Sequence, residues 1–350
     1  MKRLDYDYQG PLLKNIGRFY ISKKRKAQML TFSCSGFEVI FYGTELLAYF
    51  VATEGGKRDG EGAIAVVIDK TPLAQARKVV LDKPEALYTL AKDLAPGVHH
   101  LRVYRRTESA CSVMGWQYLL TDGEFRPLVG RKRLQIEFYG DSITAGNGVE
   151  GILGDDNFET RTENALISYA ALASEKLDAD FAIIAIGGYP LYKSPWTALP
   201  TIKSIPQMFS FADYDWGTNF TNYISWDNHR FVPDIVVINL GTNDEQYLDA
   251  LPSHEVAKEE EAICFALRDF IQQIKGAYPK TKIILTIGMI KVKKVEKILY
   301  KVSQEYQNDV YFMKFNSLSV GGFMPNGGHP NAQMHVAAGE QLAAFIKTII

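Results

Sequence analysis

LQIEFYG, at positions 134–140, is a mostly apolar run that ends in glycine, and it is the first of five mostly apolar runs in the C-terminal part of the chain. The others are FAIIAIGG (181–188), DIVVINLG (234–241), TKIILTIGMI (281–290) and VYFMKF (310–315). Runs that are apolar throughout, without alternation, are typical of strands buried on both faces of a sheet. The sequence therefore predicts a buried, parallel sheet in this part of the chain.

Segments with helical spacing of apolar residues separate these runs. They are ENALISYAALASEKL (163–177), EVAKEEEAICFALRDFIQQIKGA (255–277), a segment near 292–306, and NAQMHVAAGEQLAAFIKTII (331–350). Strands that alternate with helices indicate a parallel sheet covered by helices on both faces. Because crossovers are right-handed almost without exception, residues 131–350 are expected to form a flavodoxin-like, three-layer α/β domain.

Residues 1–130 have a different pattern of apolar and turn residues, and they are expected to form a separate domain that is all β. The chain has 350 residues, more than one ordinary domain usually holds. Short aromatic and aliphatic runs here are separated by turn residues, and no long helical pattern occurs. The sequence predicts an antiparallel sandwich of the jelly-roll type, with strands at FEVIFYG (37–43), ELLAYFVAT (45–53), AIAVVID (63–69), ALYTLAKDL (86–94) and HHLRVYRRT (100–107).

Composition and charge exclude several classes of protein. Hydrophobic residues make up 47% and charged residues 23% of the sequence, and the formal net charge is −1. Without a long basic run, binding to nucleic acid or to an anionic membrane surface is not expected. No stretch approaches the roughly 20 apolar residues of a membrane span. Lys2 and Arg3 are followed at once by Asp5 and Asp7, which is unlike a signal peptide. A cytoplasmic protein is therefore expected, although a secreted protein without its leader would look the same.

The three cysteines, Cys34, Cys111 and Cys264, are odd in number and widely spaced. No CxxC pair or cysteine–histidine cluster accompanies them, so neither a metal site nor a disulfide framework is predicted. Three reduced, buried thiols are the expected state.

Polar residues of four segments fall at the carboxyl ends of predicted strands, where ligands bind in doubly wound sheets. Ser142, in Gly-Asp-Ser-Ile-Thr (140–144), is placed on a sharp strand-to-helix turn that exposes its hydroxyl. Gly187, Asn243 and His329 follow later strands. Each has a structural alternative when taken alone: a helix cap for the serine, turns for the glycine and the asparagine, and a surface or core position for the histidine. Asp244, beside Asn243, is interpreted as structural.

Together, these four segments resemble the conserved blocks of the SGNH, or GDSL-type, hydrolases in order and in structural context. The resemblance implies that Ser142 is a nucleophile and that His329 is its base. It also implies an oxyanion hole formed by the Ser142 N–H, the Gly187 N–H and the Asn243 side chain. No metal or organic cofactor is implied.

A second resemblance covers nearly the whole chain. LAPGVHHLRVYRRTES (94–109) is similar to the jelly-roll domain that precedes the hydrolase in the second carbohydrate-esterase family, and SWDNHRFVPDIVVINLGTND (225–244) is also similar to that family. This resemblance implies an esterase that removes acetyl groups from xylan-type or mannan-type oligosaccharides through an acetyl-enzyme. Two alternatives remain open: a short-chain esterase, lipase or acyltransferase acting on other substrates, and a non-catalytic carbohydrate-binding protein.

The sequence departs from the family pattern at Asn326, where aspartate is usual three residues before the histidine. An amide cannot hold an imidazolium by charge, and its NH₂ group can favour the wrong tautomer. We therefore expect a Ser142–His329 dyad in which a backbone carbonyl orients the histidine. Asn326 is kept as a candidate orienting position.

The segment 189–232 is neither clearly helix nor clearly strand, and it is rich in aromatic residues. A loop of this length inside a compact domain is usually functional. Trp196, Trp216 and Trp226 are candidates for stacking on sugar rings, and interdomain packing or an aromatic lid is an equal alternative.

Overall fold

The structure is a computed structural model, and it describes residues 1–54, 62–109, 111–128, 130, 132–152, 154, 159–195, 204–214, 223–306, 308–316, 324 and 328–350. The chain forms two compact units. The first unit comprises Met1–Arg131, Glu159–Arg161 and Ala212–Ile224, and the second comprises Lys132–Phe158, Thr162–Phe211 and Ser225–Ile350.

The first unit is built from antiparallel strands in two sheets. Its strands are β1 (Lys2–Asp5), β2 (Lys14–Ile16), β3 (Phe19–Ser22), β4 (Ala27–Leu30), β5 (Gly36–Gly43), β6 (Leu46–Glu54), β7 (Ala63–Ile68), β8 (Arg77–Val80), β9 (Glu85–Ala91), β10 (Gly97–Arg105), β11 (Ser112–Thr121) and β12 (Glu124–Arg126). One sheet has the order β3-β4-β11-β6-β9, with β1 also paired to β11, and the other has the order β12-β5-β10-β7-β8, with β2 also paired to β5.

The eight strands from β4 to β11 have the connectivity of a jelly roll. They contribute β4-β11-β6-β9 to one sheet and β5-β10-β7-β8 to the other, so strands adjacent in space are mostly distant in sequence. The predicted all-β, jelly-roll domain is confirmed. Strand β11 was not among the predicted strands, because its register shifts between Trp116 and Tyr118 and this breaks the alternation that marks a strand.

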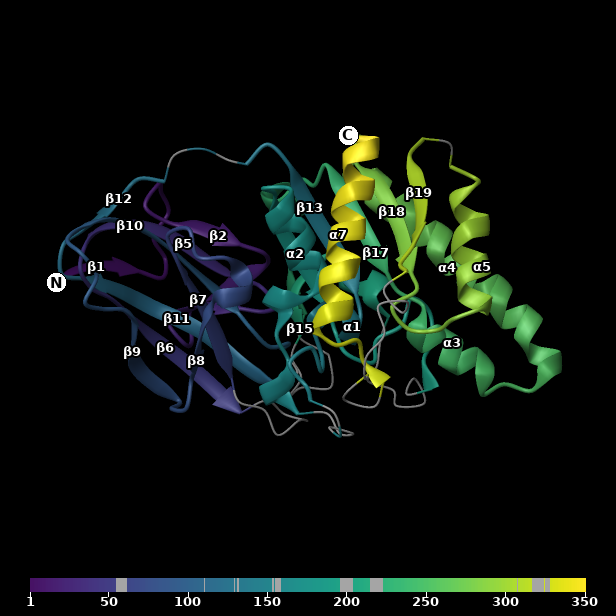
Figure 1. Ribbon diagram of the computed structural model, residues 1–350, viewed down its shortest axis with the longest axis horizontal. Coiled ribbons are helices and arrows are strands. Elements are labelled where there is room, and N and C mark those ends of the chain that lie inside the picture. Colours follow the sequence, from purple (N-terminus) through teal and green to yellow (C-terminus); the bar gives the residue numbers. More distant parts are fainter. Residues whose placement is uncertain are drawn as a thin grey trace. The chain divides into compact units, whose positions relative to one another are not determined.

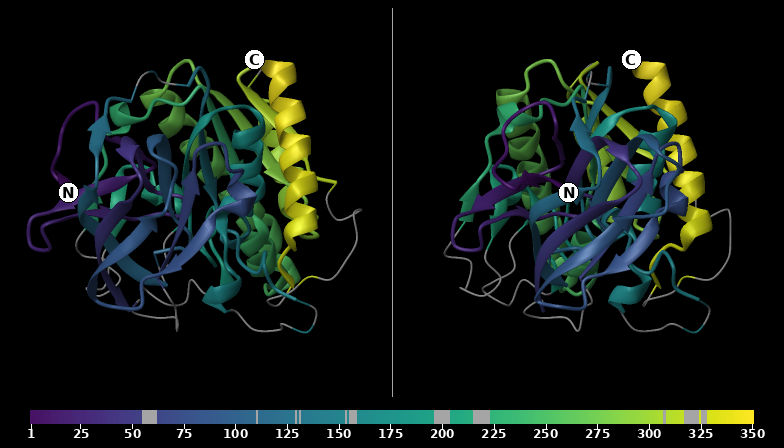
Figure 2. Two further views of the ribbon diagram at one scale, coloured as in Figure 1. Left: turned by 60° about the vertical axis from the view of Figure 1, so that its left-hand side comes forward. Right: turned by 90° about the vertical axis from the view of Figure 1, so that its left-hand side faces the viewer.

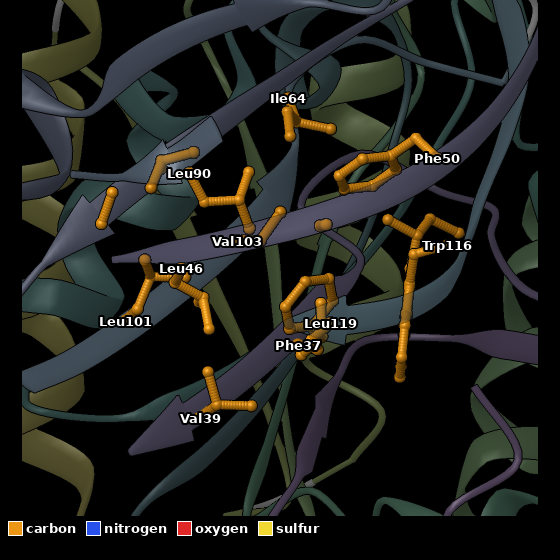
Figure 3. Packing of buried hydrophobic residues seen from close by; sticks show 14 of the residues in the cluster. Phe37, Val39, Leu46, Phe50, Ile64, Leu90, Leu101, Val103, Trp116 and Leu119 are labelled. Carbon is orange, nitrogen blue, oxygen red and sulfur yellow. The ribbon is translucent and has the colours of Figure 1, made fainter. Parts of the chain in front are cut away.

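The core of the first unit lies between the two sheets. Alternate residues of the paired strands point inward, and Phe37 and Val39 of β5 belong to one buried cluster with Phe50 of β6 and Trp116 of β11 (Figure 3). All four are fully buried, and the rings of Phe37 and Trp116 lie 5.0 Å apart between centroids. The period-two pattern of these strands is therefore what allows the two sheets to share one hydrophobic core.

His99 of β10 lies between two hydrogen-bond acceptors that favour its protonated form. Its Nδ1 lies 3.0 Å from Asp69 Oδ2 and its Nε2 lies 2.8 Å from the carbonyl oxygen of Ala95. Both partners only accept hydrogen bonds, so both ring nitrogens must donate, and only the imidazolium can do this. The Ala95 carbonyl and the Asp69 carboxylate accordingly raise the pKa of His99 above its usual value.

We expect His99→Gln to lower the stability of the protein more at pH 6 than at pH 9. Since the pKa of His99 is raised by folding, its contribution is full below the unfolded pKa and is lost as the pH rises through the folded pKa. The Asp69 side chain is 46% exposed, so solvent screening limits the effect to about 1 kcal/mol or less. Urea unfolding of both proteins at the two pH values measures it. A difference that grows with pH would contradict the assignment.

The second unit is built on a parallel sheet. Its strands are β13 (Gln135–Gly140), β14 (Asp180–Ala185), β17 (Ile235–Asn239), β18 (Lys282–Ile287) and β19 (Val310–Lys314), in the order β14-β13-β17-β18-β19. All neighbouring pairs in this sheet are parallel. In chain order this is 2-1-3-4-5, which is the flavodoxin-like order, and the predicted α/β fold is confirmed.

Helices cover both faces of this sheet (Figure 1). They include α2 (Tyr169–Lys176) and α7 (Ala332–Ile349), which pack together on one face, and α3 (Thr242–Asp249), α4 (Ser253–Ala277) and α5 (Lys294–Ser303) on the other. In both views of Figure 2, α7 is the yellow helix that ends at the C-terminus. The three layers place the carboxyl ends of all five strands at one edge.

One predicted helix is interrupted. The segment 163–177 forms a 3-10 turn over Ala165–Ile167 and then α2, with Ser168 between them in extended conformation. The Asn164 side chain accepts from Leu166 N–H, and Ser168 Oγ donates to the Ala165 carbonyl. These local hydrogen bonds satisfy the backbone without a continuous helix, which apolar spacing alone does not reveal. Within the described residues, none of the helices has both the length and the apolar character that crossing a membrane requires.

Candidate active site

Ser142 lies at the carboxyl end of the interior strand β13, at the start of the short helix α1 (Ser142–Ala145). The N-cap residue, Asp141, accepts a hydrogen bond from Ile143 N–H at 3.0 Å. Gly140 makes this turn feasible, because a Cβ there would lie 1.9 Å from Thr144 Oγ1. The sequence Gly-Asp-Ser-Ile-Thr thus encodes a turn that only glycine permits, with the serine at its apex.

His329 meets Ser142 directly. Its Nε2 lies 2.8 Å from Ser142 Oγ, although 187 positions separate the two residues. The histidine stands just before α7, whose N-cap residue, Asn331, accepts a hydrogen bond from Met334 N–H at 3.0 Å. The pair has the spacing that a general base needs in order to take the proton of a nucleophilic hydroxyl. Asn326 lies outside the described residues, so its orienting role stays a prediction.

The Asn243 amide ties three of the predicted segments together. Asn243 is 7% exposed and lies in the first turn of α3, after β17. Its Nδ2 donates to the Tyr189 carbonyl at 3.1 Å and lies 3.4 Å from Asp141 Oδ2. Tyr189 follows the Gly187-Gly188 turn, and Asp141 precedes Ser142. A single amide therefore holds the ends of β13, β14 and β17 in register.

Gly187 lies in a turn directly after β14. The next residue, Gly188, has a φ of +81°, and Tyr189 N–H donates to the Ile186 carbonyl at 3.2 Å. The left-handed conformation at Gly188 explains the second glycine of the pair. The turn thus lies at the same sheet edge as Ser142, and the contribution of the Gly187 N–H to an oxyanion hole remains a prediction.

Asp244 is a structural residue, as the sequence suggested. Its fully buried carboxylate accepts hydrogen bonds from the backbone N–H groups of Leu191, Tyr192 and Lys193, at 2.9, 2.7 and 3.1 Å. Burial raises its pKa to about 6, against the lowering effect of these donors. The residue therefore anchors the chain that leaves the Gly187-Gly188 turn.

Glu245 was missed by the sequence analysis. Its carboxylate accepts hydrogen bonds from the backbone N–H groups of Lys293, Lys294 and Val295, at distances between 2.9 and 3.1 Å. These are the first N–H groups of α5, which no residue of that helix caps with its own side chain. An acidic residue directly after Gly-Thr-Asn-Asp was the available signal, because a carboxylate is well suited to a helix N-terminus.

The proposed aromatic platform is not supported at Trp226. This side chain is only 7% exposed, and the Arg230 guanidinium lies 5.7 Å from the ring centroid. Little of the ring remains accessible for stacking on a sugar, which favours the packing alternative for Trp226. Trp196 and Trp216 lie outside the described residues, and their stacking role stays a prediction.

Comparison with known proteins identifies the family. Residues 138–347 match the GDSL-like lipase/acylhydrolase family. The chain belongs to this family. Residues 15–127 match the family described as carbohydrate esterase 2 N-terminal. Both resemblances found in the sequence are thereby confirmed, and the paired Ser142 and His329 lie within the GDSL-like part.

Two relatives align with nearly the whole length of this chain. The cellulase/esterase CelE of Acetivibrio thermocellus is 28% identical over 352 residues, which is 97% of this chain and 40% of CelE. An acetylxylan esterase/glucomannan deacetylase of Cellvibrio japonicus is 26% identical over 347 residues, 97% of this chain and 89% of that protein. The present chain therefore spans less than half of CelE but most of the second relative.

The solved structures support the fold. A family two carbohydrate esterase from Clostridium thermocellum in complex with cellohexaose superposes with a TM-score of 0.80 at 24% identity, covering 96% of this chain and 98% of that chain. A family two carbohydrate esterase from Cellvibrio japonicus gives a TM-score of 0.81 at 23% identity, with 99% and 97% covered. At this level of identity, the likeness concerns the architecture alone.

Proposed function

We propose that this chain is a serine esterase that removes O-acetyl groups from acetylated carbohydrate. The observation that carries the proposal is the 2.8 Å contact between His329 Nε2 and Ser142 Oγ at the carboxyl edge of the sheet. A nucleophile paired with a base retains the chemistry of a hydrolase, which disfavours a purely carbohydrate-binding role. The names of the relatives, including an acetylxylan esterase/glucomannan deacetylase, supply the substrate class.

The first step forms an acetyl-enzyme. His329 Nε2 takes the Ser142 proton as Oγ bonds to the acetyl carbonyl carbon. The resulting oxyanion is stabilised by the backbone N–H groups of Ser142 and Gly187 and by the Asn243 amide. The Asn243 Nδ2 contact to Asp141 is long, at 3.4 Å, so the N–H on that side of the amide is available to a better acceptor while the other keeps its hydrogen bond to the Tyr189 carbonyl. The bond from the carbonyl carbon to the sugar oxygen then breaks, and the leaving oxygen takes the proton from Nε2.

The second step reverses the roles with water. His329 Nε2 accepts a proton from water, whose oxygen bonds to the acetyl carbon. The bond to Ser142 Oγ breaks, the proton returns to Oγ, and acetate is released. The same three donors stabilise the second oxyanion. The same residues therefore act in both the formation and the hydrolysis of the acetyl-enzyme.

We expect kcat/KM to be highest for acetyl esters and to fall for butyryl and longer esters. An enzyme that removes acetyl groups from sugars needs room for only one methyl group beyond the reacting carbonyl, and a longer chain must displace packed residues. A series of p-nitrophenyl esters from acetyl to octanoyl measures this preference. A higher kcat/KM for octanoyl than for acetyl would reassign the protein to the lipases of the family.

The carbohydrate part of the proposal needs its own test. Release of acetate from acetylated xylo-oligosaccharides and acetylated manno-oligosaccharides is expected, with Ser142→Ala as the negative control. Turnover of p-nitrophenyl acetate without release from either oligosaccharide would leave an acetylesterase with a different alcohol group as its substrate.

A further inference from the structure

A fully buried histidine, His335, lies in the first turns of α7, six positions after His329. Its Nδ1 accepts a hydrogen bond at 3.0 Å from the backbone N–H of Tyr169, the first residue of α2. The α2 N-cap residue, Ser168, makes no side-chain capping hydrogen bond. The imidazole of one helix therefore caps the N-terminus of another.

The contact continues through the tyrosine toward the nucleophile. The rings of His335 and Tyr169 are nearly parallel, with 10° between their planes and 6.3 Å between centroids. The Tyr169 hydroxyl lies 3.0 Å from Thr144 Oγ1, and Thr144 belongs to α1, the helix that Ser142 begins. Both Tyr169 and Thr144 are fully buried. These contacts, from His335 through Tyr169 to Thr144, form a buried link between two helices. The link joins α7, which follows the base His329, to α1, which begins with the nucleophile Ser142.

Close packing of α2 against α7 makes this link rigid. At Gly339, one helical turn beyond His335, a Cβ would lie 3.1 Å from Leu172 Cβ and 3.2 Å from the Tyr169 carbonyl oxygen. The two helices therefore approach each other with little space between them. A shift of α7 is transmitted to α2 because packed interiors deform little.

The contact with Tyr169 fixes which nitrogen of the His335 ring carries the proton. Since Nδ1 accepts a hydrogen bond, the neutral ring carries its proton on Nε2, and this buried atom has no hydrogen-bond partner in the structure described. A buried N–H left unsatisfied destabilises a protein by about 1–3 kcal/mol. Burial also lowers the pKa of His335 to about 3, so the ring adds no positive charge when His329 becomes an imidazolium.

We propose that His335 is a positioning residue that sets the distance between His329 and Ser142 through Tyr169 and Thr144. The inference rests on the function proposed above. His329 and Ser142 are contributed by different elements, so their 2.8 Å contact depends on where α7 begins relative to α1. The link from His335 to Thr144 fixes that relation inside the protein, away from the substrate.

The test compares His335→Leu with His335→Asn, in which Oδ1 can replace Nδ1 as the acceptor for Tyr169 N–H. His254→Leu is the matched control, because His254 is an exposed histidine of α4 with 80% of its side chain accessible. Three quantities are measured: kcat and KM on p-nitrophenyl acetate, the rate at which a p-nitrophenyl phosphonate modifies Ser142, and the melting temperature.

We expect His335→Leu to lower kcat and the phosphonylation rate by about 10- to 100-fold with KM nearly unchanged, because small misplacements of catalytic groups cost about 10²-fold. His335→Asn should restore most of both rates. Thr144→Val cuts the link at its other end, so its effect should not add to that of His335→Leu.

Three results would overturn the proposal. They are a kcat of His335→Leu close to wild type, an equal loss in His335→Asn, and full additivity with Thr144→Val. A lower melting temperature with unchanged rates well below it would assign His335 to stability alone. If wild type is phosphonylated but does not turn over acetyl esters, the esterase function fails, and the phosphonylation rates still decide the role of His335.

Discussion

Replacing Ser142 with alanine is expected to abolish esterase activity while leaving the fold intact. The hydroxyl lies 2.8 Å from His329 Nε2 and is the atom that would bond to the acetyl carbon. Without it, no acetyl-enzyme forms, and only the slow attack of water assisted by the remaining groups is left. We expect kcat on p-nitrophenyl acetate to fall by at least roughly 10⁴-fold.

His329→Ala is expected to cause a loss of similar size, because nucleophile and base act as a unit and their effects are not additive. Circular dichroism and thermal melting provide the control for folding. Retention of most of the wild-type turnover in purified Ser142→Ala would rule out Ser142 as the nucleophile and, with it, the proposed mechanism.

Asp244→Ala is expected to destabilise the protein by about 2–4 kcal/mol and to lower its activity. The substitution removes a charged acceptor from three backbone N–H groups, and hydrogen bonds to charged groups are among the more valuable ones in a fold. The chain at 191–193 follows the Gly187 turn, so its release should disturb the oxyanion donors as well. Urea unfolding and kcat on p-nitrophenyl acetate measure the two effects.

The pH dependence gives a second readout. The pKa of Asp244 is about 6 in the fold, above its usual value, so the folded state binds this proton more tightly than the unfolded state. Its contribution to stability therefore rises as the pH falls from about 6 toward 4 and declines as the pH rises through 6. Asp244→Asn does not titrate and should lose this part of the pH dependence.

Asp249→Ala is the matched control, because Asp249 is an exposed carboxylate of the same helix and pairs with Lys294 at the surface. Asp249→Ala should lower the free energy of unfolding by less than about 1 kcal/mol. Equal destabilisation by Asp244→Ala and Asp249→Ala would show that the burial of Asp244 and its three backbone donors add nothing to the stability of the protein.

The parallel sheet was predictable because its strands are buried on both faces and appear in the sequence as uninterrupted apolar runs such as DIVVINL. Strand β11 was harder to predict from the sequence, since the shift of register beside Gln117 disturbs the alternation of inward and outward residues. The break at Ser168 depends on side-chain hydrogen bonds to the backbone, which compete with helix formation and leave the apolar spacing unchanged.

The site was predictable where sequence motifs coincide with strand ends. Ser142 and His329 were paired because their segments resemble the blocks of the GDSL-type hydrolases, and the structure brings them into contact. The sequence left stacking and packing open for Trp226, because an aromatic residue in an irregular segment has the same sequence signal whether it is exposed or buried. Glu245 and His335 accept hydrogen bonds from residues about 50 and 166 positions away, and no local sequence pattern predicts such contacts.

The carboxylates of Asp244 and Glu245 accept hydrogen bonds from main-chain N–H groups, those of residues 191–193 and of residues 293–295, and the Lys294 ammonium also lies 3.9 Å from Glu245 Oε1. Every amino acid except proline offers a main-chain N–H, so these hydrogen bonds do not require particular side chains in the two segments. Substitutions in the two segments, other than by proline, can therefore accumulate during evolution while these hydrogen bonds are kept.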